Sequence, residues 1–302
     1  MTNTDSLKGF WALIATQFQG AFSDMVYKTL LTLVAMSTAA TSAQGSTRVS
    51  EINALFIIPF LLFSMYGGFL ADRFSKRSVT TGTKLLEVAI MLLAMLAAWM
   101  GSLELGMAAL FLLGTQAALF GPAKYGILPE LLPEKRLSWG NGILEMTTFL
   151  SIILGTVVGG LLAEGLRGRL YLAGILLVGL ALTGVVSSLG ITRVSPANPQ
   201  AHFRLNFVSD MFRSIAISRK DRVLWLAVAG SVYFWFLGLL MQTNILFFGK
   251  NVLGVPEARI GYLLAALAVG IGLGSYVAGI VSGRKIEYGL IPLGSIGISA
   301  FL

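Results

Sequence analysis

This 302-residue chain consists of long hydrophobic stretches separated by short polar and charged clusters. A helix needs about 20 apolar residues to cross the roughly 30 Å hydrocarbon core of a membrane. The pattern therefore predicts an all-α polytopic membrane protein with eight full spans and the start of a ninth near residue 287. The predicted spans are residues 8–36, 51–71, 79–100, 104–131, 138–164, 168–189, 222–249 and 256–283.

The segment between two of these spans, residues 67–77, is short and dense in charge. Its order of glycine, three residues, aspartate, a basic residue, two residues and a basic residue is similar to the signature loop of the major facilitator superfamily. Ser75 stands where that family usually has glycine. The resemblance implies a major facilitator fold and a secondary transporter. It assigns a gating loop to Gly68, Asp72, Arg73, Lys76 and Arg77.

The distribution of Lys and Arg predicts a cytoplasmic N-terminus, because basic residues gather on the cytoplasmic side of membrane proteins. With that orientation fifteen basic residues lie inside and five outside, so the net charge of +8 reflects topology and not nucleic-acid binding. The fifteen are Lys8, Arg73, Lys76, Arg77, Lys84, Lys135, Arg136, Arg193, Arg204, Arg213, Arg219, Lys220, Arg222, Arg284 and Lys285. The five are Arg48, Arg167, Arg169, Lys250 and Arg259.

The longest polar stretch separates six spans from the rest of the chain. It opens with two prolines and continues with Phe203, Phe207, Met211, Phe212 and Ile215 at helical spacing. This spacing predicts an amphipathic helix on the cytoplasmic membrane surface, with a mobile linker as the alternative. The expected organisation is a six-helix N-terminal bundle at 1–190, a cytoplasmic linker at 191–221 and a partial C-terminal bundle at 222–302.

A short internal repeat supports two related halves. Gly68, Asp72 and Arg73 align with Gly279, Gly283 and Arg284, and the second copy lacks the aspartate. Twelve spans of about 20 residues with their loops need roughly 390 residues. We therefore expect the chain to be a fragment that is truncated before the end of the second half, with helices 7 and 8 and the start of helix 9.

Composition argues against a soluble enzyme. Mean hydropathy is +0.81 and only 12% of residues are charged, against roughly 25% in ordinary globular proteins. The chain has no cysteine and a single histidine, so neither a disulfide framework nor a Cys/His metal site is expected. With no nucleophile–base pair or metal cluster apparent, the sequence predicts no enzyme activity and no cofactor.

Charged residues inside predicted spans are costly and are candidates for a binding site. Asp24 and Lys28 lie four residues apart in the first span, where they share a face and can pair. Gln17 and Gln19 add polar surface nearby. The functional interpretation is a central-cavity site for a polar or zwitterionic substrate group, and the alternative is a self-neutralising pair inside the bundle.

A second candidate site closes the fourth predicted span. Lys124 follows the helix-breaking Pro122, and Glu145 enters the membrane at similar depth four residues after Asn141. Lys124 is expected to pair with Glu145, with Glu130 as the rival partner. This arrangement suits a cytoplasmic gate or substrate contact, and a purely structural pair is the alternative.

Three runs carry a closer resemblance: residues 20–28, residues 121–131 with Gly-Pro-Ala-Lys-Tyr-Gly-Ile-Leu-Pro-Glu-Leu, and residues 141–146 with Asn-Gly-Ile-Leu-Glu-Met. They are similar to the bacterial lysophospholipid transporter family, in the branch often fused to an acyltransferase and an acyl-ACP synthetase. The resemblance implies movement of lysophospholipid from the outer to the inner leaflet of the inner membrane, with those enzymes as possible partners. Asp24 would meet an ethanolamine ammonium, and Lys28 or Lys124 the phosphate.

The mechanism implied is alternating access by rocking of two halves. Asp72 is expected to latch one state by pairing with basic residues and with the N-terminus of the following helix. Asp24 and Glu145 are candidate proton carriers, and Glu87 is a weaker one. The alternative functions are a general exporter of drugs or small metabolites, or a non-transporting membrane anchor for fused lipid-acylating enzymes.

Overall fold

The computed structural model describes residues 3–201, 207–254, 257–283 and 289–301, and all regular structure in these ranges is helical. The expected all-α architecture is confirmed. The chain forms two compact units, Met1–Ala201 with Gly272–Leu302 and, separately, His202–Ile271.

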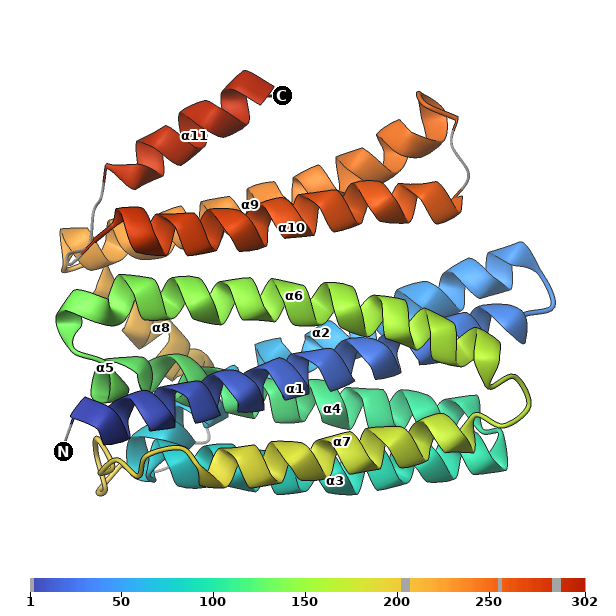
Figure 1. Cartoon of the computed structure of the whole chain (residues 1–302), viewed down its shortest axis with the longest axis horizontal. Coiled ribbons are helices and arrows are strands. Elements are labelled where there is room, and N and C mark those ends of the chain that lie inside the picture. The colour runs from blue at the N-terminus through green and yellow to red at the C-terminus, as the bar shows by residue number, and fades with distance from the viewer. Residues whose placement is uncertain (1–2, 202–206, 255–256, 284–288, 302) are drawn as a thin grey trace. The chain divides into compact units, whose positions relative to one another are not determined.

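Each span predicted before residue 190 corresponds to a long helix of the first unit (Figure 1). The helices are α1 (Asn3–Ser37), α2 (Ser42–Arg73), α3 (Lys76–Met100), α4 (Leu103–Gly126), α5 (Leu128–Leu131), α6 (Leu137–Gly165) and α7 (Tyr171–Leu189). The span predicted over 104–131 is confirmed as Leu103–Leu131, although the chain divides after Gly126 into α4 and the single turn α5. Helix α2 begins nine residues earlier than predicted, since the Thr41 hydroxyl accepts a hydrogen bond from the Gln44 N–H at 3.2 Å.

Seven helices among the described residues are long and apolar enough to cross a membrane: α2, α3, α4 with α5, α6, α7, α9 (Arg222–Asn251) and α10 (Glu257–Val281). Helix α1 is 35 residues long but is not among them. Its polar residues Gln17, Gln19 and Asp24 are buried, so they face other helices and not lipid. A helix of this kind belongs inside a bundle.

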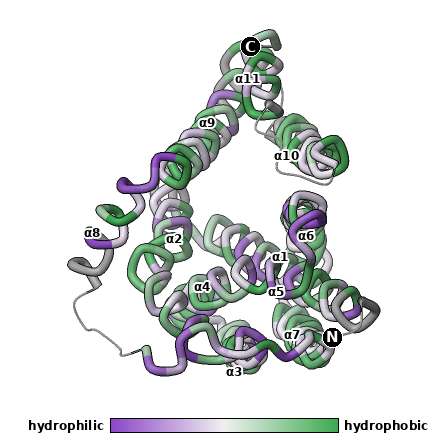
Figure 2. Tube along the Cα trace, turned by 90° about the vertical axis from the view of Figure 1, so that its left-hand side faces the viewer, coloured by the Kyte–Doolittle hydropathy of each residue, from purple (hydrophilic) through white to green (hydrophobic). Residues whose placement is uncertain are grey.

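Helix α1 lies at the centre of the first unit. It packs against α6 and α7 and also contacts α2 and α4, while α3 packs against α7 and α4, as the end-on view in Figure 2 shows. Apolar side chains fill the spaces between these helices, including Tyr27, Met91 and Leu113 toward one end and Phe10 and Leu144 toward the other. The central position of α1 brings its polar residues within reach of several neighbours.

Two glycines let α6 approach α1 closely. A Cβ built on Gly159 would lie 2.8 Å from the Val26 carbonyl oxygen, and one on Gly155 would lie 2.7 Å from the Phe22 carbonyl oxygen. Any larger side chain at either position would push the helices apart. Small residues commonly permit such contacts in membrane bundles.

The junction between α2 and α3 consists only of Phe74 and Ser75. Helix α3 begins at Lys76, three residues earlier than predicted, and Lys84 lies in its third turn. Lys84, which we counted among the basic residues of the cytoplasmic side, is fully buried. Its charge is neutralised inside the bundle by Glu87.

Beyond the linker lie α8 (Phe207–Ser218), α9, α10 and α11 (Leu290–Phe301). Helix α8 occupies the predicted amphipathic segment, where Phe212 and Ile215 are exposed. Phe203, Arg204, His202, Arg284 and Lys285 fall outside the described residues. Gly283 directly follows the last turn of α10 and has a φ of +63°, a conformation that favours glycine, at the position aligned with Asp72.

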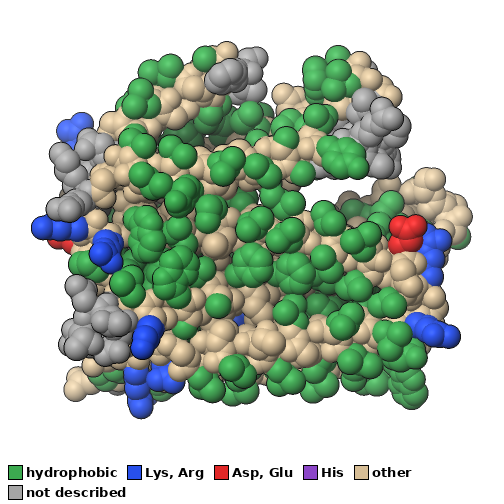
Figure 3. Space-filling model, viewed as in Figure 1, with side chains coloured by type: hydrophobic (Ala, Val, Ile, Leu, Met, Phe, Trp, Pro, Cys, Tyr) green, Lys and Arg blue, Asp and Glu red, His purple; other side chains and the backbone are tan. Residues whose placement is uncertain are grey.

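Hydrophobic side chains cover the sides of the helices on the face drawn in Figure 3, and charged side chains lie near helix ends. Many large apolar residues are exposed, including Leu61, Trp99, Leu161 and Val186. A soluble monomer rarely exposes so much contiguous apolar surface. This surface is suited to contact with lipid.

Candidate functional site

A layer of polar side chains crosses the interior of the first unit. Gln17, Gln19, Ser23 and Asp24 of α1 are each no more than 9% exposed, although they sit among apolar helices. Polar groups buried in such surroundings require hydrogen-bond partners or a function. The two glutamines have partners on α3 and α6, and Ser23 accepts from Gln19, whereas Asp24 Oδ1 has no partner among the described residues.

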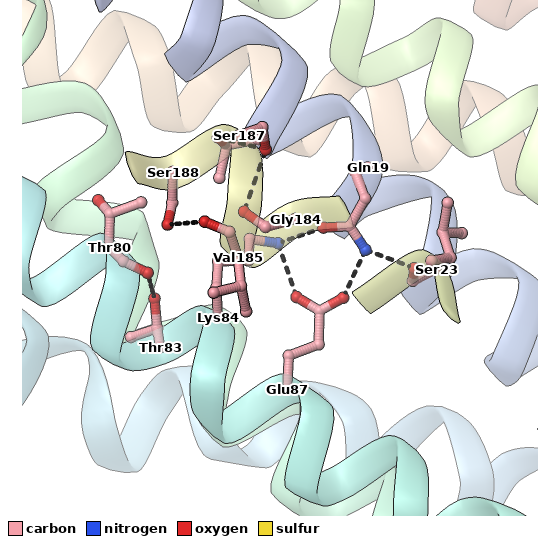
Figure 4. Close-up of polar contacts among 12 residues, drawn as sticks. Gln19, Ser23, Thr80, Thr83, Lys84, Glu87, Gly184, Val185, Ser187 and Ser188 are labelled. Carbon is pink, nitrogen blue, oxygen red and sulfur yellow. Dashed lines mark hydrogen bonds and ion pairs between the residues drawn. The ribbon is translucent and has the colours of Figure 1, made fainter. Parts of the chain in front are cut away.

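The centre of the layer is an ion pair on α3. Lys84 Nζ lies 2.6 Å from Glu87 Oε2, and both side chains are fully buried. Gln19 of α1 joins them, because its amide nitrogen donates to Glu87 Oε1 at 2.8 Å and its oxygen accepts from Lys84 Nζ at 3.0 Å (Figure 4). The same amide nitrogen donates to the Ser23 hydroxyl at 2.9 Å. Charge and hydrogen-bonding capacity are thus satisfied across α1 and α3.

Glycines make room for this network. A Cβ on Gly20 would overlap Lys84 Nζ, and one on Gly184 of α7 would overlap the Gln19 amide. The Phe120 ring of α4 covers Lys84, with Nζ 5.5 Å from the ring centroid. The ammonium therefore lies in a closed site formed by four helices.

Asp24 stands apart from this network. Its Oδ1 atom is buried and has no hydrogen-bond partner among the described residues. The charges of Glu87, Lys84 and Lys124 act on it from neighbouring helices. A buried carboxylate oxygen without a partner is the kind of group that binds a ligand or a proton.

Asp24 and Lys28, which could have paired on one helix face, form no ion pair in the described part of the chain. Lys28 Nζ lies over the Phe56 ring of α2, 5.1 Å from its centroid, and makes no ion pair with a described carboxylate. Residues four apart share only a broad face of a helix. Asp24 is turned into the bundle, whereas Lys28 is half-buried against α2.

The second candidate site brings together Lys124 and Glu145 with a third residue, Tyr125. The sequence had given Tyr125 no role. Lys124 Nζ lies 4.6 Å from the centroid of the Tyr125 ring, and the Tyr125 hydroxyl donates to Glu145 Oε1 at 2.8 Å. The expected direct ion pair between Lys124 and Glu145 is absent among the described residues. Glu130 is not its rival partner either, since Lys76 Nζ lies 2.5 Å from Glu130 Oε1.

Gln17 and Asn141 make contacts within the fold. Gln17 donates to the Thr147 hydroxyl at 2.7 Å and accepts from the Thr148 hydroxyl at 2.9 Å, which ties α1 to α6. Asn141 is exposed and donates to the Leu137 carbonyl of its own helix at 3.0 Å. These contacts favour a role in positioning helices.

The basic residues of the gating loop hold neighbouring backbone. Arg77 donates to the Leu189 carbonyl at 2.6 Å, and Arg73 donates to the Ala201 carbonyl at 3.1 Å. The Asp72 carboxylate makes no hydrogen bond or ion pair with the described residues, and only its backbone carbonyl is engaged, by the Asn198 N–H at 2.8 Å. The expected capping of the following helix by Asp72 is therefore not formed.

Sequence reasoning counted Lys84 only among the basic residues of the cytoplasmic side and gave Glu87 a minor place as a weaker candidate proton carrier. Their signal was available: opposite charges at i and i+3, followed directly by the apolar run of residues 88–100. In a membrane helix this spacing indicates a self-neutralising buried pair.

Apolar helices surrounding a buried polar layer define a multi-pass membrane protein. The profile of the Major Facilitator Superfamily matches residues 13–302, and the chain belongs to this family. Among curated relatives, the lysophospholipid transporter LplT of Klebsiella pneumoniae is 31% identical over 285 residues, which cover 90% of this chain and 66% of the relative. The corresponding transporter of Salmonella typhimurium is 30% identical over 282 residues, or 90% and 65% of the two chains. This chain thus spans about two thirds of the length of these relatives.

Solved structures support the fold. A POT family transporter in complex with 5-aminolevulinic acid superimposes with a TM-score of 0.54 at 17% identity, covering 83% of this chain and 55% of the other. A peptide transporter POT in complex with alafosfalin gives a TM-score of 0.53 at 19% identity, covering 84% and 54%. At these identities the likeness concerns the fold alone.

Proposed function

We propose that the protein is a secondary transporter that moves lysophospholipids from the outer to the inner leaflet of a bacterial inner membrane by alternating access. Membership of the major facilitator superfamily supports transport as the activity. The names of the relatives from Klebsiella and Salmonella support lysophospholipid as the substrate class. The basic residues on the side of the α2–α3 junction support a cytoplasmic N-terminus.

The observation that carries the proposal is the unpartnered oxygen of Asp24. A lysophospholipid with an ethanolamine headgroup bears an ammonium, and a buried carboxylate with a free acceptor atom complements it. Lys84 does not compete with the substrate ammonium for Asp24, since the Lys84 ammonium already donates to Glu87 and Gln19. Asp24 is thus left available to the substrate.

Lys124 supplies the complementary charge. Its ammonium rests on the Tyr125 ring and is not held by a carboxylate, so it is free to act as a point charge toward a phosphate. Glu145 and Tyr125 flank this position from α6 and α4. Asp24 and Lys124 carry opposite charges, which complement the ammonium and the phosphate of a zwitterionic headgroup.

Delivery of a lysophospholipid to the inner leaflet would provide the substrate of a reacylating enzyme. We therefore propose an acyltransferase and an acyl-ACP synthetase, fused or associated, as functional partners. Transport would proceed by rocking of helical halves, with the loop at Gly68, Asp72, Arg73, Lys76 and Arg77 changing its contacts between states.

Competition during uptake tests the substrate class. Spheroplasts that express the protein are expected to take up labelled lysophosphatidylethanolamine faster than vector controls, and unlabelled lysophospholipid should compete while cationic dyes should not. Competition by the dyes alone would indicate a general exporter. Uptake equal to that of the vector control would indicate a membrane anchor without transport.

A further inference from the structure

The first turn of α3 is uncapped. Ser75 occupies the N-cap position, but its side chain makes no capping hydrogen bond. The first N–H of the helix to find a backbone acceptor is that of Val79, which donates to the Ser75 carbonyl at 3.0 Å. The N–H groups of Lys76, Arg77 and Ser78 have no acceptor among the described residues, so the positive end of a 25-residue helix is open.

Ser75 also carries an unsatisfied hydroxyl. The residue is 7% exposed, and its Oγ atom is buried without a hydrogen-bond partner in the part of the chain that the structure describes. A buried hydroxyl normally has a partner, and an orphaned one calls for an explanation. The side-chain oxygen of an N-cap residue usually accepts a hydrogen bond from a backbone N–H in the first turn of the helix. The Ser75 hydroxyl accepts no such bond.

A pocket of about 480 Å³ lies against this helix end. Phe74, Ser75 and Ser78 line it from the α2–α3 junction, and Arg193, Ser195 and Pro196 line it from the linker after α7. Its volume falls within the usual range for small-molecule sites. Arg193 is exposed and makes no ion pair or hydrogen bond with the described residues, so its charge is available.

The linker segment that carries Arg193 is held by hydrogen bonds on both sides of this residue. The Arg77 guanidinium donates to the Leu189 carbonyl before it, and the Asn198 N–H donates to the Asp72 carbonyl after it. The linker therefore holds the guanidinium near the helix end. The Asp72 carboxylate does not line the pocket.

We propose that this pocket binds a phosphate group. The open N–H groups of α3 and the Ser75 hydroxyl would donate hydrogen bonds to its oxygens, and Arg193 would supply the opposite charge. Because the pocket lies at a helix end, the phosphate can belong to an anionic phospholipid headgroup at the membrane surface or to a free phosphate anion. The site is separate from Asp24 and Lys124 and does not depend on the transported substrate.

Thermal unfolding of the purified protein in a nonionic detergent, followed by tryptophan fluorescence, tests the proposal. One arm titrates inorganic phosphate against chloride at equal ionic strength, and the other titrates phosphatidylglycerol against diacylglycerol in mixed micelles. We expect concentration-dependent stabilisation by a phosphate-bearing ligand, as binding to the native state requires. Stabilisation by both inorganic phosphate and phosphatidylglycerol would show that the free anion is sufficient for binding. Stabilisation by phosphatidylglycerol alone would identify a site for a lipid headgroup.

Two variants and one control locate the binding. Arg193→Gln and Ser75→Ala should each raise the apparent Kd roughly tenfold, the effect of one charge-assisted hydrogen bond. Arg213→Gln removes the same charge from an exposed position on α8 and should leave the Kd unchanged. Ser75→Ala should not lower stability in the absence of ligand, because it removes an unsatisfied hydroxyl. Equal effects of Arg193→Gln and Arg213→Gln, or no stabilisation by either ligand, would overturn the proposal.

Discussion

Lys84 Nζ and Glu87 Oε2 lie 2.6 Å apart on α3, and neither side chain has any exposed surface. Removing one member of a buried ion pair leaves an uncompensated charge and typically costs about 3–5 kcal/mol, whereas replacing both with apolar residues is often neutral. The pair therefore neutralises two charges within the bundle and positions Gln19 of α1 through two hydrogen bonds.

Lys84→Met should accordingly lower the thermal stability of the purified protein sharply. The double variant Lys84→Met with Glu87→Leu should recover most of the loss, because no charge is then left unpaired. Thermal unfolding followed by tryptophan fluorescence measures the stability of both variants. Lys8→Met, at an exposed lysine, is the control. A double variant less stable than Lys84→Met alone would contradict this account.

Gly159→Val should disrupt the packing of α6 on α1. The new side chain would meet the Val26 carbonyl and the Thr29 side chain at 2.8 Å, so the helices must separate or the chain must misfold. Overpacking of this kind typically costs about 1–3 kcal/mol. The measurement is the monodisperse fraction after detergent extraction and size-exclusion chromatography.

Gly160→Val provides the matched control for that experiment. The same substitution one residue later meets no atom within 4 Å. It should leave the monodisperse fraction close to wild type. Equal losses for the two variants would show that helix propensity, and not the contact with α1, explains the effect.

Tyr125→Phe should separate the two contacts of this ring. The substitution keeps the aromatic face under Lys124 but removes the hydroxyl that donates to Glu145 at 2.8 Å. Because Tyr125 is 44% exposed, we expect a reduction in uptake of no more than about tenfold. Tyr125→Leu removes both contacts and should reduce uptake further, and equal uptake by the two variants would argue against a role for the ring.

The hydrophobic pattern was sufficient to predict the helices, because a span must be long and apolar to cross a membrane. It also identified Asp24 as buried, since a carboxylate in the middle of a long helix of this kind has to face the interior. Helical spacing did not predict partners. Lys28 turns to Phe56, and Tyr125 stands between Lys124 and Glu145, because a partner depends on which neighbouring helix each side chain meets.

The surroundings of Lys84 were likewise not predictable from helical spacing. The distribution of basic residues placed Lys84 on the cytoplasmic side, but did not show that its side chain is fully buried in the bundle. Only the packing of α1 and α7 around α3 reveals Gln19 and Gly184 beside it. Contacts between helices distant in sequence are set by packing and cannot be derived from periodicity.

The measurement that tests the central claim most directly is uptake of labelled lysophosphatidylethanolamine by spheroplasts that express Asp24→Asn or Lys124→Ala, with Lys8→Ala as the exposed control. If Asp24 binds the ammonium and Lys124 the phosphate, each site variant should lower uptake at least about tenfold at unchanged expression, while the control stays near wild type. Wild-type uptake by both site variants would contradict the assignment of the substrate site to these two residues.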